Sequence, residues 1–270
     1  MAGLNEERRN TMSQEILYEI KDGVGRITFN RPEARNAFTF PMYERLAKIC
    51  VEASADSSVK ALVLTGANEN AFAAGTDISE FRKFSSAKDT LDYEVRINNL
   101  LDGLERVPKP TIAAIAGVCT GGGATIAACC DIRIGAANTR FGVPISRTLG
   151  NCLSMANYVR LVALLGQARV KEIIFTGRLV EAGEARAIGL LSEVLPDYAA
   201  LQTRADELAR TVASRAPLTL RMTKEALRRI KEKMTPDEDE EMIVACYMSR
   251  DFQEGMDAFL NKRPPKWTGT

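Results

Sequence analysis

The chain has 270 residues, of which 46% are hydrophobic and 26% are charged, and its formal net charge is +1. This length and composition allow one large domain, or a domain with an appendage, while the balanced charge argues against nucleic acid or a membrane surface as a partner. The sequence contains no histidine. This excludes histidine metal sites, Ser-His-Asp and Cys-His nucleophiles, and imidazole acid/base chemistry.

The cysteines and the N-terminus both indicate a cytoplasmic protein. The six cysteines form no CxxC pair, so buried free thiols in a reducing cytosol are expected rather than a zinc site. The first ten residues are polar and lack the apolar core of a signal peptide, and no later window approaches a membrane span. We expect a flexible N-terminal tail over residues 1–12.

The first half of the chain alternates strand-like and helix-like segments. Short apolar runs rich in β-branched residues predict strands, and apolar residues at helical spacing predict helices. The predicted elements are strands at Ile16–Ile20 and Arg26–Phe29 joined by a glycine turn, a helix at Pro41–Ser54, strands at Lys60–Gly66 and Thr111–Val118, a helix from Ala124, and a strand at Asp131–Ala136. This alternation predicts an α/β core.

After Tyr158 the pattern becomes mainly helical, interrupted by one apolar run at Leu190–Leu195. The predicted helices are Val170–Thr176, Glu181–Ile188, Leu201–Ser214, Leu218–Lys233 and Asp237–Ser249. We therefore assign residues 13–200 to the core and residues 201–270 to a C-terminal helical region. Such a region either mediates self-association or covers the core, and the sequence leaves both alternatives open.

Two loops of small residues follow predicted core strands, at Asn70–Glu80 and Cys119–Thr125. In α/β proteins, ligands bind beyond the carboxyl ends of strands, and unpaired N–H groups in the first turn of a helix carry partial positive charge. One N–H from each loop would form an oxyanion hole. The alternative is structural, because Asp77 and Glu80 also form a D-x-x-E capping pattern and glycines are common in tight turns.

The loop at Asn70–Glu80 resembles the F-x-A-G-x-D signature of the crotonase superfamily, the enoyl-CoA hydratase/isomerase family. Seven further segments agree with this family in the right order, and together they cover nearly the whole chain from about Ile16. They are Phe29–Ala37, Pro108–Gly117, the triple glycine Gly121–Gly123, Cys130–Ile134, Phe175–Arg178, Ala187–Leu191 and Ala258–Pro265.

The resemblance implies a spiral of repeated ββα units with a C-terminal helical region that assembles homotrimers or pairs of trimers. It implies an acyl-CoA thioester as the substrate, with no metal or redox cofactor and no nucleic-acid or membrane partner. By position, the backbone N–H groups of Thr76 and Gly122 would be the oxyanion donors. The residues implied along the CoA are Arg35, Ala37, Ala73, Asp77 and Ile78, with Phe259 and Lys262 near a neighbouring subunit's CoA.

The chain departs from the family's hydratases at the acid/base positions. Those enzymes use two glutamates to handle the water and the α-proton, and this chain has Thr125 and Ile145 in their places. No shift of alignment recovers a carboxylate, because residues 132–171 contain no Asp or Glu. The reaction therefore needs other groups or none.

Two sets of residues are candidates for replacement chemistry. The segment Ser146–Asn157 offers Arg147, Asn151, Cys152, Ser154 and Asn157. Their structural alternatives are helix capping for Asn151, a small buried hydrophobe for Cys152, and a surface charge or a partner of Asp131 for Arg147. The segment after the first loop offers the acids Glu80, Asp92 and Glu94, of which Glu80 has the capping role as its stronger claim.

The sequence alone leaves three functions open. The first is an enzyme that stabilises a thioester enolate, with hydration as the family default and decarboxylation or retro-aldol cleavage as reactions that need less from the protein. The second is an acyl-CoA-binding homologue without hydratase activity. The third and weakest is thioester hydrolysis by Cys152 or Ser154, which no histidine can activate.

Overall fold

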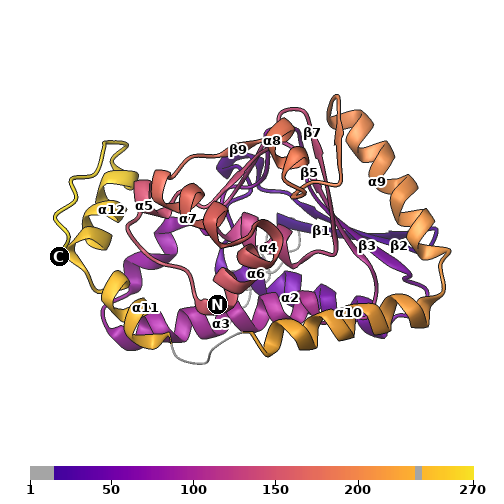
Figure 1. Cartoon of the computed structure of the whole chain (residues 1–270), viewed down its shortest axis with the longest axis horizontal. Helices are drawn as coiled ribbons and strands as arrows, with labels where there is room; N and C mark the ends of the chain where they lie inside the picture. Colours follow the sequence, from indigo (N-terminus) through magenta and orange to yellow (C-terminus); the bar gives the residue numbers. More distant parts are fainter. Residues whose placement is uncertain (1–14, 235–238) are drawn as a thin grey trace, which may run out of the picture.

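The computed structural model describes residues 15–234 and 239–270. Helices surround two β-sheets: α3 and α10 run along one side, α9 lies at one end, and α11 and α12 lie at the other (Figure 1). The tail predicted for residues 1–12 and the start of the helix predicted from Asp237 lie outside the described residues. Within the described residues, no helix is both long enough and apolar enough to cross a membrane.

The larger sheet has six strands in the order β1-β2-β3-β5-β7-β10, and the smaller has four in the order β4-β6-β8-β9. Among the described strands, the β1–β2 hairpin in the first sheet and the β8–β9 pair in the second are antiparallel, and the other pairs are parallel. The strands are β1 (Ile16–Lys21), β2 (Val24–Phe29), β3 (Ala61–Gly66), β4 (Ala71–Ala73), β5 (Thr111–Ile115), β6 (Val118–Thr120), β7 (Ile132–Ala136), β8 (Arg140–Gly142), β9 (Val180–Glu181) and β10 (Glu193–Leu195).

From β3 to β8, successive strands alternate between the two sheets. The pairs β3–β4, β5–β6 and β7–β8 each place one strand in the larger sheet and the next in the smaller, and each pair is followed by helical residues. This is the predicted spiral of ββα units, which the structure confirms. The carboxyl ends of β4 and β6 lie side by side because these two strands pair in parallel.

The strand predicted at Thr111–Val118 is wrong, because the structure divides it into β5 and β6. The corner between them is Gly117, whose φ of 62° lies in the left-handed region. A Cβ at this position would lie 2.0 Å from the backbone oxygen of Asn70, an oxygen that accepts a hydrogen bond from the N–H of Val118. The glycine is therefore what allows the chain to turn from one sheet into the other.

Each of the predicted helices has a counterpart within the described residues, with shifts of a few residues at its ends. The helical segments are η1 (Pro32–Ala34), α2 (Phe40–Ala55), η2 (Ile78–Lys83), α3 (Ala87–Glu105), α4 (Gly122–Cys129), α5 (Ile145–Thr148), α6 (Met155–Leu165), α7 (Gln167–Thr176), α8 (Ala182–Ala187), α9 (Tyr198–Ala213), α10 (Pro217–Glu232), α11 (Glu240–Tyr247) and α12 (Arg250–Leu260). Helix α3 was not among the predicted elements, although Ser86 and Asp89 form a capping box at its start.

The C-terminal helices do not all have one role. Helix α9 covers the larger sheet, where Leu201, Ala205 and Ala209 are buried in a core cluster with strand residues. Helix α10 has no buried residue and is held by ion pairs such as Lys224 to Asp131, 2.7 Å apart. Of the two roles left open for the C-terminal region, helix α9 therefore has the role of covering the core.

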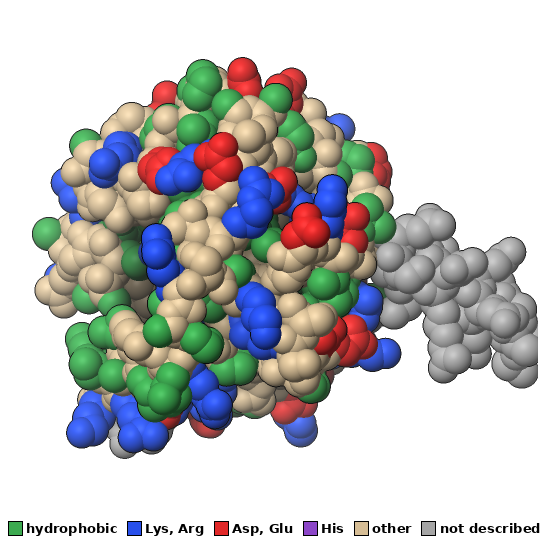
Figure 2. Space-filling view, turned by 90° about the vertical axis from the view of Figure 1, so that its right-hand side faces the viewer, with side chains coloured by type: hydrophobic (Ala, Val, Ile, Leu, Met, Phe, Trp, Pro, Cys, Tyr) green, Lys and Arg blue, Asp and Glu red, His purple; other side chains and the backbone are tan. Residues whose placement is uncertain are grey.

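The surface shows no block of one charge on the side where α9 and the start of α10 lie. Basic and acidic side chains stand close together there, with apolar side chains between them (Figure 2). Several of them form ion pairs, including Arg204 with Glu193 at 2.7 Å and Arg26 with Asp206. Exposed pairs of this kind contribute little to stability individually.

The substitution Gly117→Ala is expected to lower the free energy of unfolding by at least about 2 kcal/mol, because it combines a positive φ with a backbone clash. Urea unfolding measures this change. The control is Gly103→Ala in α3, where nothing lies within 4 Å of the added Cβ. It should instead stabilise the helix by about 0.5–1 kcal/mol, and equal effects of the two substitutions would contradict the assignment.

Candidate functional site

A pocket of 640 Å³ lies beyond the carboxyl ends of β4 and β6. Both loops of small residues line it, as do residues of α3, α5, α11 and α12. The pocket therefore brings together segments from the middle and the end of the chain. Its position agrees with the ligand site expected beyond the ends of parallel strands.

The first loop is fixed by a backbone bridge between Phe38 and Thr76. The N–H of Phe38 donates to the oxygen of Gly75 at 2.7 Å, and the N–H of Asp77 donates to the oxygen of Phe38 at 2.8 Å. In a parallel bridge of this kind, the middle residue directs its own N–H to the opposite side. The N–H of Thr76 is therefore unpaired within the described residues, and Thr76 lines the pocket.

The second loop presents another unpaired N–H group. Gly121 has φ 52° and ψ −124°, a conformation open to glycine, and Gly122 is the first residue of α4. The first N–H groups of a helix have no partner within it. A Cβ built on Gly122 would lie 3.4 Å from the nitrogen of Thr76, so the two loops are in backbone contact. The free N–H groups of Thr76 and Gly122 therefore belong to residues that are neighbours in space, although they are far apart in the sequence.

Two glycines of the triple run, Gly122 and Gly123, are also needed for space. A Cβ on Gly122 would lie 2.3 Å from the hydroxyl oxygen of Tyr43, and a Cβ on Gly123 would lie 2.2 Å from the backbone oxygen of Ala73. Ala73 itself is fully buried, and its neighbour Ala74 lines the pocket. The second loop thus sits against β4 at a distance that only glycine permits.

Two buried tyrosines support the first loop. The Thr76 hydroxyl shares hydrogen bonds with the hydroxyl of Tyr43 at 2.9 Å and with that of Tyr93 at 3.1 Å. Burial raises the pKa of Tyr43 to about 12 and that of Tyr93 well above its usual value. Both phenols therefore stay neutral, and they hold the Thr76 side chain in one position.

The structure brings Thr125 and Ile145, the two positions where the resemblance implies glutamates in hydratases, into this pocket. Thr125 lies on α4 and its hydroxyl donates to the backbone oxygen of Gly122 at 2.9 Å, while Ile145 is buried at the start of α5. Both line the same cavity as Thr76. Neither side chain can exchange a proton with a bound ligand at neutral pH.

The candidates of the segment Ser146–Asn157 have different positions. Arg147 is exposed and does not line the pocket, and the alternative that it pairs with Asp131 is wrong because Lys224 occupies that carboxylate. Ser154 is fully buried, and its hydroxyl donates to Asn98 at 2.8 Å and accepts from Asn157 at 3.1 Å. These contacts indicate a structural role for Ser154.

Asn151 and Cys152 both line the pocket. Asn151 does not cap a helix, because its Nδ2 donates to the hydroxyl of Tyr247 at 3.1 Å, and its Oδ1 is buried without a partner among the described residues. Cys152 is half-buried, and a hydrogen bond with Cys246, together with burial, raises its pKa. A thiolate at Cys152 is therefore disfavoured, which argues against thioester hydrolysis by this residue.

The three candidate acids after the first loop have different environments in the structure. Glu80 accepts from the N–H of Phe40 at 3.4 Å, so it meets the start of α2 instead of completing a box with Asp77. Asp77 alone caps η2, accepting from the N–H of Ser79 at 3.0 Å. Asp92 is exposed and pairs with Lys88. Only Glu94 enters the pocket, where it is 6% exposed.

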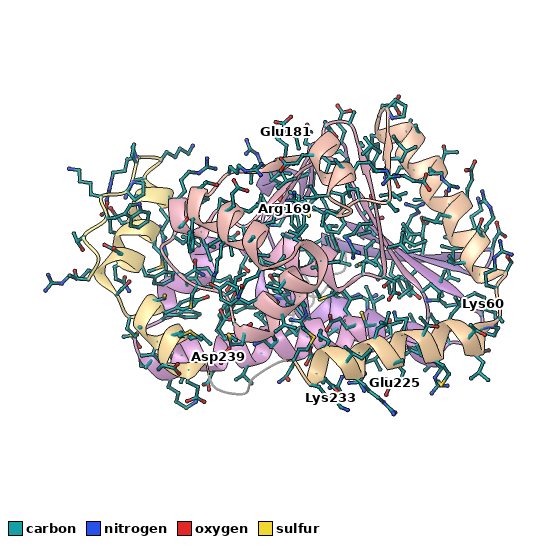
Figure 3. All side chains as sticks on the ribbon, viewed as in Figure 1. Lys60, Arg169, Glu181, Glu225, Lys233 and Asp239 are labelled. Atoms are coloured by element: carbon teal, nitrogen blue, oxygen red, sulfur yellow. The ribbon has the colours of Figure 1, made fainter. Side chains whose placement is uncertain are left out.

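The environment of Glu94 makes it an unusual carboxyl group. Burial raises its pKa to about 7, opposed by a hydrogen bond from the hydroxyl of Tyr247 at 2.6 Å and assisted by the charge of Asp239. Asp239 stands just before α11, the helix that carries Tyr247 and packs against α3 (Figure 3). In the sequence, Glu94 is one of three candidate acids, and no local signal distinguishes it from Glu80 and Asp92.

The mouth of the pocket carries charged side chains of both signs, with Glu33 exposed beside the cations. Arg35 and Lys262 are both exposed and line it, and Asp77 is neutralised by Arg31 at 2.7 Å. Phe259 also lines the pocket of its own chain, because α12 folds back against the loop after α5, where Gly255 meets the backbone of Leu149. No second subunit is needed to bring Phe259 and Lys262 to this pocket. Ala37 and Ile78 of the implied set also line its wall, whereas Ala73 is fully buried and does not.

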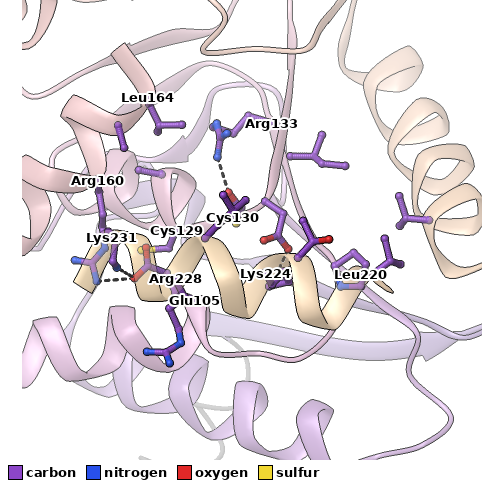
Figure 4. A pocket seen from close by; sticks show the side chains of 18 residues that line it. Glu105, Cys129, Cys130, Arg133, Arg160, Leu164, Leu220, Lys224, Arg228 and Lys231 are labelled. Atoms are coloured by element: carbon purple, nitrogen blue, oxygen red, sulfur yellow. Dashed lines mark hydrogen bonds and ion pairs between the residues drawn. The ribbon is translucent and has the colours of Figure 1, made fainter. Parts of the chain in front are cut away.

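A second cavity of 420 Å³ lies under α10, beside α4 and α6 (Figure 4). Its charged groups are largely paired: Lys231 with Glu105, Lys224 with Asp131, and Arg133 with the backbone oxygen of Cys130 at 2.5 Å. Burial raises the pKa of its two cysteines, so both stay thiols. We assign this cavity to the packing of α10. Across the described residues, no cluster of acids and cysteines is arranged to hold a metal ion.

Comparisons with known proteins find similar sequences and structures over most of the chain. A family model described as enoyl-CoA hydratase/isomerase matches residues 19–270. The short-chain-enoyl-CoA hydratase of Clostridium acetobutylicum is 35% identical over 254 residues, covering 92% of this chain and 95% of the relative.

Two solved structures illustrate the range of similar proteins. An enoyl-CoA hydratase/carnithine racemase from Magnetospirillum magneticum has a TM-score of 0.77 and 34% identity, over 95% of this chain and 96% of the other. A methylmalonyl-CoA decarboxylase in complex with 2-nitronate-propionyl-CoA has a TM-score of 0.87 and 28% identity, over 95% and 99% of the two chains.

The raised pKa of Glu94 predicts a specific dependence of stability on pH. The folded protein keeps a proton on Glu94 up to about pH 7, whereas the unfolded chain releases it near pH 4.5. The contribution of Glu94 to the free energy of unfolding is therefore fully present below pH 4.5, and it is lost as the pH rises through 7. Urea unfolding should show wild type losing up to about 3 kcal/mol more than Glu94→Gln across this range. If the free energy of unfolding had the same pH dependence in wild type and Glu94→Gln, the raised pKa of Glu94 would be contradicted.

Proposed function

The chain belongs to the enoyl-CoA hydratase/isomerase family, and we propose that it is an enzyme that stabilises the enolate of an acyl-CoA thioester between two backbone N–H groups. The observation that supports this function is the adjacency of the unpaired N–H groups of Thr76 and Gly122 on the wall of one pocket. Fixed donors at such a position act on charge that develops on the thioester oxygen, and each is worth roughly 3 kcal/mol of barrier.

The shape and charge of the pocket support a CoA ester as the ligand. Arg35 and Lys262 at the mouth provide positive charge for phosphate groups, and the interior beyond the two N–H groups is lined by apolar side chains such as Phe81, Ile97 and Leu153. The relatives named above act on CoA thioesters according to their names. The acyl group would thus lie inside and the nucleotide outside.

The missing glutamates direct the choice of reaction. Water addition by paired acids has no support in a pocket with Thr125 and Ile145 at the two positions. A reaction whose substrate supplies its own leaving group, such as decarboxylation or retro-aldol cleavage, needs mainly the enolate site. The similarity to methylmalonyl-CoA decarboxylase, at a TM-score of 0.87, favours decarboxylation as the specific candidate.

Self-association into homotrimers or pairs of trimers remains a prediction. Helix α10 supports it, since it exposes a row of apolar side chains that another copy could cover. They are Leu218, Met222, Leu227 and Ile230.

A panel of CoA thioesters followed by mass spectrometry tests the proposed activity. The panel contains saturated, α,β-unsaturated, α-carboxyl and β-hydroxyl acyl chains. We expect binding of CoA esters, turnover of an α-carboxyl or β-hydroxyl member, and at most slow hydration of crotonyl-CoA. Hydration of crotonyl-CoA at ordinary enzyme rates would contradict the importance of the missing acids. Binding without turnover would instead favour an acyl-CoA-binding homologue, and no binding would overturn both functions.

The double substitution Thr125→Glu, Ile145→Glu tests the same point by gain of function. Both positions line the pocket, so the variant restores a pair of carboxyls beside the two N–H groups. General acid/base catalysis contributes about 10²–10⁴-fold, and we expect crotonyl-CoA hydration to rise by at least about 10²-fold. The control is the matched pair Thr125→Gln, Ile145→Gln, which should show no gain. An equal gain in both variants would exclude the carboxyls as the cause.

A further inference from the structure

We propose that Glu94 is the residue that exchanges a proton with the α-carbon of the thioester bound in this pocket, held in place by Tyr247. This inference rests on the proposed function, because it needs an enolate at the N–H groups of Thr76 and Gly122. It assigns the acid/base role to α3 and α11, two helices that do not contain either position of the missing glutamates.

The position of Glu94 places it on the same wall as the oxyanion donors. Its neighbour Tyr93 bonds the Thr76 hydroxyl at 3.1 Å, which ties this turn of α3 to the first loop. Glu94, Ile97 and Thr76 all line the same cavity. A thioester with its oxygen at Thr76 therefore has its acyl chain in the space that Glu94 borders.

Among the described residues that line this pocket, Glu94 is the single acid that is buried. Glu33 is exposed at the mouth, with a side chain 72% accessible, and Asp77 is paired with Arg31. In Glu94, Oε1 accepts the hydrogen bond from Tyr247, whereas Oε2 has neither a partner nor full enclosure among the described residues. Oε2 is thus the oxygen available to a ligand.

The groups that face Glu94 allow it both to accept and to donate a proton. They are Tyr247 on α11, Asp239 just before α11, Tyr43 on α2, Tyr93 on its own helix and Cys152 in the loop after α5, and none of them is a cation. Burial among such groups raises the pKa of Glu94 to about 7. A carboxyl near neutrality is present as acid and as base at physiological pH, which suits proton transfer to and from carbon.

The proposed step balances without any further reactant. In the forward direction the Cα–H bond breaks, its proton forms an O–H bond at Oε2 of Glu94, and its electron pair forms the enolate whose oxygen accepts from Thr76 and Gly122. In a decarboxylation, the bond between Cα and the carboxylate breaks instead and CO₂ leaves. The neutral Glu94 then gives its proton to Cα and becomes a carboxylate.

Tyr247 acts on Glu94 as a positioning residue. Its hydroxyl donates to Oε1 at 2.6 Å and accepts from Nδ2 of Asn151 at 3.1 Å, so the donor direction is fixed toward the carboxylate. This hydrogen bond favours the charged form of Glu94 and lowers its pKa against the effect of burial. Removal of the hydroxyl should therefore raise the pKa of Glu94.

Exchange of α-hydrogens in D₂O measures the proposed step directly. Acetyl-, butyryl- and octanoyl-CoA are incubated with the full-length protein, and the gain in mass of each ester is followed with time. For every ester that binds, we expect exchange with wild type and a loss of at least about 10²-fold with Glu94→Gln, with the dissociation constant changed less than threefold. Asp92→Asn is the matched control, because Asp92 is an exposed acid on the same helix.

The outcomes separate this inference from the proposed function. Exchange that is equal in wild type and Glu94→Gln would overturn the role of Glu94 and leave the enolate site standing. Binding without any exchange by wild type would overturn the proton transfer. No binding of any of the three esters, or of CoA itself, would overturn the proposed function with it.

The variant Tyr247→Phe provides a readout that a purely structural role would not move. Exchange from Cα needs the carboxylate, so its rate should rise with pH around a midpoint near 7 in wild type. In Tyr247→Phe this midpoint should move to higher pH, because the donor to the carboxylate is gone. An unchanged midpoint would contradict the positioning role of Tyr247.

Discussion

The site depends on the close approach of two backbone loops at the ends of β4 and β6. Gly75 and Thr76 in one loop meet Gly121 and Gly122 in the other with no side chain between them, since any Cβ on Gly122 would meet the Tyr43 hydroxyl. The bridge from Phe38 uses the peptide groups on either side of Thr76 and leaves the N–H of Thr76 free. A fold that alternates strands between two sheets produces this meeting point, because it makes β4 and β6 parallel neighbours.

The chain combines this backbone arrangement with a buried acid on α3. Thr125 and Ile145, the positions where the resemblance implies glutamates in the family's hydratases, carry no carboxyl, while Glu94 accepts a hydrogen bond from the hydroxyl of Tyr247. This arrangement makes the C-terminal helices part of the site, because α11 supplies Tyr247 and α12 supplies Phe259 and Lys262. Local opening of α11 would therefore change the basicity of Glu94 as well as the shape of the pocket.

The α/β alternation and both loops could be predicted from the sequence because their signals are local, whereas the spiral was implied by the resemblance to the family. Glycine and alanine after an apolar strand can be read within a dozen residues, as at Asn70–Glu80. The break at Gly117 was missed because the contact that requires it, with the oxygen of Asn70, joins residues far apart in the sequence. Helix α3 was missed even though Ser86 and Asp89 provide a local capping signal.

The role of Glu94 could not be predicted from its own segment. Glu80, Asp92 and Glu94 have the same chemistry in the sequence, and burial separates them only after α11 has packed on α3. The partner that orients Glu94 lies 153 residues further along the chain. Contacts over such distances follow from the tertiary fold, whereas the two loops that hold Thr76 and Gly122 are marked by their own residues.

The central claim is that the N–H groups of Thr76 and Gly122 polarise one thioester oxygen. Infrared difference spectroscopy of bound butyryl-CoA labelled with ¹³C at its carbonyl tests this claim most directly. Two hydrogen bonds from fixed donors should move the carbonyl stretch to lower frequency than in water, and Glu94→Gln should keep that shift because Glu94 is not a donor to this oxygen. A bound ester whose carbonyl frequency equals that in water, or exceeds it, would contradict the account.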